Sequence, residues 1–395
     1  MADPRKQQVL LVVTILVVAA NLRPTITAYG SVVGMIGQDT GLGPAALGVL
    51  GAIPLLAFAS VSPLVHLLSR RYGPDRAVLG ATVVLIAGTA LRSLPGGSMA
   101  TLWIGTAVLG SAIAVCNVAV PAIVKRDFPG EVPLVTGLYA AVLSTTAAFA
   151  SGLTLPIALR SSWQAGIGIW GLLSVVALAA WLVRLRSVRR VDFESRGART
   201  TDAQTMWTSP VAWQVTMFMA TQATTFYLLV TWLPTIEISL GVDPVTAGWH
   251  SFLFQIVGIG AGLGITPMMR GRTDHRLVGV AISVLLMVAI AGLLVAPAWV
   301  LVWLMLAGVS SGSSLVLALA LIGERSRTSE DAGRLSGMSQ SVGYLLSAGG
   351  PIGAGLLFQA TGSWTYPLLA VIGVGAAQVV VSLYAGRDRF THATV

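Results

Sequence analysis

The chain has 395 residues, of which 55% are hydrophobic and only 10% are charged, and its formal net charge is +9. An ordinary soluble domain carries about 25% charged residues, so this composition excludes a soluble enzyme and predicts an integral membrane protein. The Lys and Arg residues lie mainly between long apolar runs. This placement is typical of cytoplasmic loops, and it excludes nucleic-acid binding as the reason for the charge.

Twelve apolar runs are long enough to cross a bilayer, which takes about 20 residues each. They predict an all-α integral membrane fold with twelve transmembrane helices. The runs are 8–36, 45–69, 77–94, 99–124, 132–159, 164–183, 209–236, 245–269, 277–295, 298–323, 332–359 and 364–385.

The first run contains Arg23, the only Lys or Arg in the middle of a predicted span. An Arg at the bilayer centre costs roughly 2.5–3.5 kcal/mol, and all 15 acids fall in loops or at span ends. Pro24 disfavours helical geometry at Arg23, which suits a bent helix facing a cavity. We therefore expect the planar guanidinium fork to bind an anionic or electron-rich group, with Asn21 close by. The alternative is that Arg23 joins neighbouring helices through carbonyls and amides.

Later runs carry polar and aromatic side chains near their middles. Amides and phenols are costly in lipid and should face protein or a cavity. Those of the eleventh run are four residues apart and so share one helix face. Beside Arg23 and Asn21, the predicted substrate-binding residues are Asn117, Phe226, Tyr227, Gln255, Gln340 and Tyr344.

An acid and a histidine lie near the outer ends of the seventh and eighth runs. Glu237 is the acid closest to a membrane position, and His250 is able to titrate near neutral pH. Together they are candidates for proton coupling. The alternative is that His250 is an interfacial residue beside Trp249, because Trp residues gather at membrane surfaces.

The longest break between runs is the polar stretch 185–208, which is predicted to be a cytoplasmic linker. It separates an N-terminal six-helix bundle, 1–184, from a C-terminal six-helix bundle, 209–395. The sequence GLGPAALG at 41–48 returns as GVDPVTAG at 241–248. A parallel repeat of six spans is the signature of the major facilitator architecture, in which the substrate site lies at the midplane between the halves. Chance similarity among Gly-rich apolar helices is the alternative.

The distribution of basic residues predicts the orientation in the membrane. With a cytoplasmic N-terminus, the inner side holds 21 of the 24 Lys and Arg residues, and the outer side holds only Arg92 and Arg160. Arg23, within a span, is the remaining one. Both termini are therefore expected to be cytoplasmic.

Three segments carry a family resemblance. They are Asn21-Leu22-Arg23-Pro24, FYLLVTWLP at 226–234 and GMSQSVGYLLSAGGP at 337–351. They resemble the cyanate porter branch of the major facilitator superfamily, which includes the 2-nitroimidazole transporter, and the similarity covers nearly the whole chain. The resemblance implies a carrier of the bacterial inner membrane for small anions or small polar, electron-poor compounds.

This superfamily often carries an acid and several arginines in the loop after the second span, where they lock the inner gate. Here the loop reads HLLSRRYGPDR from His66 to Arg76, and Arg70 replaces the usual acid. The resemblance therefore implies a gate of Arg70, Arg71, Asp75 and Arg76, with Asp75 as the substitute ion-pair partner. Solvated loop charges are the alternative.

These observations predict a secondary active transporter that moves a small anionic or electron-rich polar solute by alternating access, coupled to proton symport. We expect no catalytic residue, metal site, cofactor or nucleic-acid partner, and a monomer in the lipid bilayer of a bacterial cell membrane. An exporter of drugs or metabolites is the first alternative, although the lack of a mid-membrane acid disfavours cationic drugs. A membrane sensor is the second, and the chain has no nucleotide-binding P-loop.

Overall fold

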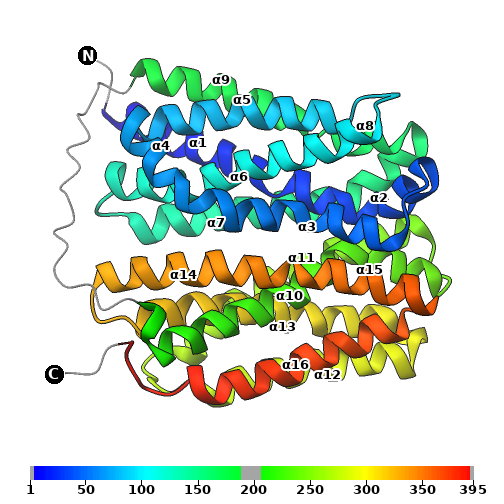
Figure 1. Cartoon of the computed structure of the whole chain (residues 1–395). Coiled ribbons are helices and arrows are strands. Elements are labelled where there is room, and N and C mark those ends of the chain that lie inside the picture. Colours follow the sequence, from blue (N-terminus) through cyan, green and yellow to red (C-terminus); the bar gives the residue numbers. More distant parts are fainter. Residues whose placement is uncertain (1–3, 188–205, 392–395) are drawn as a thin grey trace.

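The computed structural model describes residues 4–187 and 206–391, and the secondary structure there is entirely helical. Figure 1 shows the helices from the first half of the chain on one side of the molecule and those from the second half on the other. Helix α1 begins and α16 ends at the same end, which we call the terminal end. We call the opposite end, where α2 meets α3, the closed end. Residues 188–205 of the predicted linker lie outside the described part.

The helices of the first half follow the predicted runs closely. Three runs are split between consecutive helices: at Arg23, between Val61 and Val65, and between Gly168 and Gly171. The elements are α1 (Pro4–Leu22), α2 (Pro24–Thr40), α3 (Pro44–Val61), η1 (Ser62–Leu64), α4 (Val65–Tyr72), α5 (Pro74–Arg92), α6 (Met99–Asp127), α7 (Val132–Arg160), α8 (Trp163–Gly168) and α9 (Gly171–Ser187).

The elements of the second half are η2 (Met206–Thr208), α10 (Pro210–Ser239), α11 (Pro244–Met269), α12 (Arg276–Val295), η3 (Pro297–Trp299), α13 (Val300–Glu324), α14 (Ser329–Ser347), α15 (Gly349–Thr361) and α16 (Thr365–Ala385). In this half, the eleventh predicted run is split between α14 and α15, whereas the seventh and eighth runs are continuous helices.

Eleven helical segments of the described residues are long and apolar enough to cross a membrane. The remaining predicted span corresponds to α10, which has 30 residues but carries several Thr, Gln and Glu side chains. Many of these face protein, because Thr216, Gln222 and Glu237 are all buried. The prediction of an all-helical membrane fold is confirmed.

Prolines and glycines define several helix boundaries. Pro44 and Pro74 stand at the first positions of α3 and α5, where a missing amide hydrogen costs nothing. Gly41 ends α2 with a φ of 71°, and Gly73 separates α4 from α5 with a φ of 81°. Only glycine adopts these left-handed conformations without strain, so the turns follow directly from the sequence.

The two halves approach each other most closely at the closed end. A Cβ atom at Gly48 of α3 would lie only 2.4 Å from the carbonyl oxygen of Pro351 in the other half. The amide of Ala45 donates to Oε1 of Gln359 at 3.1 Å, which also joins the halves. The absence of a side chain at Gly48 therefore allows backbone-to-backbone contact that seals this end.

Charged side chains at the terminal end pair within their own half. Asp75 and Arg126 form an ion pair in the first half at 2.5 Å. In the second half, Nε2 of His275 and Oε2 of Glu324 form a hydrogen bond at 2.6 Å. These interactions brace each half by itself and do not join the two halves.

Gly30 of α2 offers a direct test of the closed end. A Cβ there would lie 2.0 Å from the carbonyl oxygen of Val230 in α10. We expect Gly30→Ala to push α2 away from α10 by at least about 1.5 Å, the shift needed to restore van der Waals contact. Spin labels are attached to cysteines introduced at Gln38 and Ala360 in a Cys116→Ser background. Double electron–electron resonance between them measures the resulting separation of the halves.

The matched control is Gly34→Ala, one turn further along the same helix. No atom lies within 4 Å of a Cβ at Gly34, so this change should leave the distance as in the wild type. An equal distance in both variants would show that the added methyl at Gly30 is accommodated without opening the closed end.

Candidate functional site

Arg23 lies at a break in the first membrane segment. Helix α1 ends at Leu22 and α2 begins at Pro24, with Arg23 between them. Pro24 has no amide hydrogen, and the carbonyl of Arg23 accepts the amides of Ile26 and Thr27 at 2.9 and 3.0 Å. The structure therefore contains the helix interruption that the Arg-Pro pair predicts.

The Arg23 guanidinium faces aromatic rings of the other half. Its Cζ lies 5.9 Å from the ring centroids of both Phe226 and Tyr227 of α10. A cation–π contribution is weak at this distance, because it is limited to about 6 Å. Among the described residues, the half-buried Arg23 side chain has no hydrogen-bond or ion-pair partner. Its five N–H donors are therefore available to a ligand.

Aromatic rings continue around this point. The ring of Tyr227 lies 6.2 Å from that of Tyr344 in α14, which in turn lies 5.4 Å from that of Phe58 in α3. The Tyr227 hydroxyl is buried and has no hydrogen-bond partner in the described part of the chain. A buried polar group without a partner is costly, so a ligand that bonds to it gains affinity. We call Arg23, Phe226, Tyr227, Tyr344 and Phe58 the Arg23 site.

Two of the predicted amides are engaged elsewhere. Asn21 donates to the carbonyl of Leu173 at 2.8 Å and accepts from the hydroxyl of Ser174 at 2.8 Å, which joins α1 to α9. Gln255 donates to the hydroxyl of Ser151 at 2.6 Å and so links α11 to α7 across the two halves. The role of joining helices, which was the alternative for Arg23, belongs to these amides.

The other two predicted amides are less constrained. Gln340 donates to the hydroxyl of Ser336, one turn earlier in α14, at 2.9 Å. Asn117 of α6 is half-buried and forms no hydrogen bond with a described residue. The structure does not place either amide against the Arg23 guanidinium.

Phe58 and Tyr139 are aromatic residues that the sequence did not point to. Phe58 contacts Tyr344. Phe58 also belongs to a buried hydrophobic cluster, and Tyr139 of α7 packs against that cluster. An aromatic residue in an apolar run has the same pattern whether it faces lipid or a cavity. The only available signal was that both residues lie within predicted spans.

Asp75 forms ion pairs, but not with the neighbouring arginines that the family resemblance implied. Its partners are Arg126 of α6 at 2.5 Å and Arg184 of α9 at 3.0 Å. Asp127 completes the group, bonding to Arg126 at 2.6 Å and also to Arg184. We call these four residues the ion cage, and it joins α5, α6 and α9.

The other residues of the predicted gate lie outside this cage. Arg70, Arg71 and Arg76 are exposed, and none of them pairs with an acid in the described part of the chain. The gate role of these three arginines stays a prediction.

Arg92, which was counted among the basic residues of the outer side, is buried at the end of α5. Only 2% of its surface is exposed. Its Nη2 donates to the carbonyl of Thr25 at 2.8 Å. That carbonyl belongs to the first turn after Pro24, so Arg92 supports the interrupted segment from behind.

Glu237 and His250 are in direct contact, with Nδ1 of His250 lying 2.5 Å from Oε2 of Glu237. Glu237 has no exposed surface, and its other oxygen lacks a hydrogen-bond partner among the described residues. A buried carboxylate with one partner is a group that can gain or lose a proton when its surroundings change. The pair connects α10 to α11 on the closed-end side of the Arg23 site.

The described residues contain no group of three or more His, Cys, Asp or Glu residues that could hold a metal ion. The single cysteine, Cys116, is buried in the first half. The Arg23 site therefore offers binding by a guanidinium, hydroxyls and aromatic rings.

The family described as the Major Facilitator Superfamily matches residues 15–351. The chain is 36% identical to the 2-nitroimidazole transporter of Escherichia coli (strain K12) over 385 residues, which cover 97% of each protein. It is 25% identical to the cyanate transport protein CynX of the same organism over 371 residues, covering 92% of this chain and 95% of the relative.

Solved structures show the same fold at much lower sequence identity. A bacterial homolog of the human lysosomal transporter Spinster, in an inward-facing and occupied conformation, superposes with a TM-score of 0.77. The match covers 100% of both chains at 13% identity.

Proposed function

Because the chain belongs to the major facilitator superfamily, we propose that it is a secondary active transporter that binds a small anion, or a small polar solute with electron-rich oxygens, at Arg23. It is a multi-pass membrane transporter of small solutes and not an enzyme. The observation that carries the proposal is the position of Arg23. Its charge lies within a membrane segment, faces the other half of the molecule, and has no acid partner among the described residues.

Charge is the first argument for the class of solute. An unpaired Arg within a membrane is costly, and an anion between the halves offsets that cost. The planar fork of N–H donors matches the two oxygens of a carboxylate or nitro group. A cationic solute would meet Arg23 without any nearby carboxylate, since Asp75 and Asp127 are both committed to the ion cage at the terminal end.

Shape is the second argument. Arg23 faces the rings of Phe226 and Tyr227, and Tyr344 packs against Tyr227. These rings offer a solute flat faces and edges rather than flexible side chains. Such rings favour a small, flat, conjugated solute, because stacked and edge-on contacts both require planarity. The substrates named for the two relatives, 2-nitroimidazole and cyanate, are both small and carry electron-rich terminal atoms.

The difference between the two ends supports alternating access. The backbones of the halves touch at the closed end, whereas the ion cage and the His275–Glu324 pair at the terminal end stay within their own halves. We therefore propose that this state receives the solute from the terminal end. The excess of exposed arginines there supports a cytoplasmic position for that end, in a bacterial cell membrane.

Glu237 is the proposed proton carrier. It is buried beside His250 while the closed end is sealed, and separation of α2 from α10 would bring water to it from the opposite side of the membrane. A proton taken up there neutralises the carboxylate and offsets the charge of a co-transported anion. This would make the cycle electroneutral for a monovalent anion.

Uptake into proteoliposomes tests both parts of the proposal. The panel contains 2-nitroimidazole, cyanate, a neutral amide and a small organic cation, each with and without an imposed pH gradient. A gradient of one pH unit stores about 1.4 kcal/mol per proton, which is enough for about tenfold accumulation of the solute. We expect gradient-driven accumulation of the anion or the nitro compound and none of the cation. Transport of the cation alone would overturn the proposed solute class, and movement only out of the vesicles would identify an exporter.

Variants separate coupling from binding. Glu237→Gln is expected to abolish accumulation driven by the pH gradient and to preserve solute exchange across the vesicle membrane. The matched control is Glu324→Gln, which removes the other His–Glu contact of the same half but lies at the terminal end. If Glu237→Gln still accumulates solute, the proton is carried by another group, while the binding role of Arg23 stands.

A further inference from the structure

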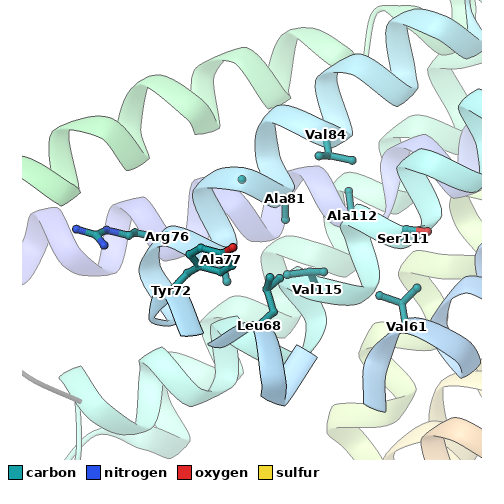
Figure 2. A pocket seen from close by; sticks show the side chains of 11 residues that line it. Val61, Leu68, Tyr72, Arg76, Ala77, Ala81, Val84, Ser111, Ala112 and Val115 are labelled. Carbon is teal, nitrogen blue, oxygen red and sulfur yellow. The ribbon is translucent and has the colours of Figure 1, made fainter. Parts of the chain in front are cut away.

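A groove runs along the first half of the molecule between α4, α5 and α6. Figure 2 shows Arg76 and Tyr72 towards one end and Val84 and Val61 towards the other. Its volume is about 430 Å³, and a second cavity of about 430 Å³ adjoins it along α4. All of its lining residues come from the first half, so it is separate from the Arg23 site.

Two features of the sequence form this groove. The second membrane segment is interrupted by η1, which contains Pro63, so that α4 is offset from α3. Helix α5 presents Ala77, Gly80 and Ala81, which are spaced three and four residues apart on one face and have almost no side-chain volume. A Cβ at Gly80 would meet no atom within 4 Å, which shows how open the groove is there.

The end of the groove nearest the terminal end is positively charged. Arg76 lines the first cavity and Arg71 lines the second. Both are exposed, and neither pairs with an acid in the described ranges. The intervening acid, Asp75, is already bonded within the ion cage. The groove therefore has a cationic mouth without a counter-charge.

The interior of the groove is apolar and extends into the membrane segment. From Arg76 to Val84, α5 rises about 12 Å at 1.5 Å per residue. Over this length the lining is aliphatic apart from Tyr72 at the mouth and Ser111 near the far end. Val84 is 41% exposed, as expected for a side chain in contact with hydrocarbon.

We propose that this groove is a binding site for an anionic phospholipid. One acyl chain lies over Ala77 and Ala81, and the phosphate accepts hydrogen bonds from Arg71 and Arg76. Basic clusters at a membrane surface attract anionic headgroups, and the charge pattern here matches such a lipid from headgroup to chain. A bound lipid would fill the space beside η1 and hold α4 against α5 and α6.

The experiment compares lipids on the full-length protein, purified and stripped of lipid in detergent. Phosphatidylglycerol and phosphatidylcholine with identical chains are titrated, and binding is read by native mass spectrometry together with the unfolding temperature. We expect preferential binding of phosphatidylglycerol and a higher unfolding temperature with it. Arg71→Gln and Arg76→Gln should each reduce that preference about fivefold. Gly80→Leu, which places a side chain in the groove, should remove the binding of the tightly held lipid.

Control variants distinguish this site from general attraction to lipid. Arg70→Gln removes an exposed arginine of α4 that lines neither cavity, and Gly373→Leu adds a side chain at another glycine with open space around it. Both should bind phosphatidylglycerol as the wild type does. Equal binding of the two lipids, unchanged binding in Gly80→Leu, or equal stabilisation by inorganic phosphate would each overturn the proposal.

Discussion

Replacement of Arg23 by glutamine is expected to weaken solute binding about 10- to 100-fold, the range for loss of one charge-assisted hydrogen bond of about 1.5–3 kcal/mol. The unfolding temperature should stay the same or rise, because the Arg23 charge has no ion-pair partner among the described residues whose loss would destabilise the fold. Equilibrium binding of the solute identified by the uptake panel, together with thermal unfolding in the same detergent, measures both effects.

Arg23→Lys is the matched variant, because it keeps the charge and removes the planar fork. Its affinity should fall between those of the wild type and Arg23→Gln, since lysine offers a point charge instead of paired donors. A fall in unfolding temperature of Arg23→Gln with unchanged affinity would show that Arg23 is a structural residue that holds helices together.

The largest effect on stability is expected at Arg184. Its side chain has no exposed surface and bonds to both Asp75 and Asp127. Arg184→Ala leaves these two partly buried carboxylates close together, with Arg126 as their remaining cationic partner. Breaking a buried ion pair from one side costs about 3–5 kcal/mol, and we expect a loss of that size in the free energy of unfolding. Denaturant titration of the purified protein measures it.

Arg276→Gln provides the contrasting control. The Arg276 guanidinium lowers the pKa of Asp274 to about 2, but about half of each side chain is exposed to solvent. Water screens such a pair, so its removal should cause no measurable change in unfolding. Comparable losses in both variants would mean that burial of the ion cage contributes nothing beyond a surface pair.

The membrane segments were predictable because an apolar run of span length has few alternative structures. The unusual position of Arg23 was predictable for the same reason, since a charged residue inside such a run is easily recognised. The aromatic residues around Arg23 were only partly predictable. Phe226, Tyr227 and Tyr344 were predicted, whereas Phe58 was not. The apolar pattern of a run does not show which of its residues are buried between the two halves.

Partners of polar groups were harder to predict than the groups themselves. Asp75 was assigned to its sequence neighbours, yet the fold brings Arg126 and Arg184 to it from 51 and 109 residues away. Arg92 was counted among the basic residues of the outer side, but its side chain is buried and donates to the carbonyl of Thr25. Such contacts depend on how helices pack, and a single sequence carries no record of that packing.

The interruption at Arg23 makes the first membrane segment two rods connected by a joint. The first rod, α1, is fastened to α9 of its own half through Asn21, whereas the second, α2, touches α10 of the other half through Gly30. A solute bound at Arg23, as proposed above, would lie at this joint, and its fit would depend on the angle between α1 and α2. It follows that an anionic compound too large for the site would hold α1 and α2 at one fixed angle. Such a compound would act as an inhibitor rather than as a transported solute.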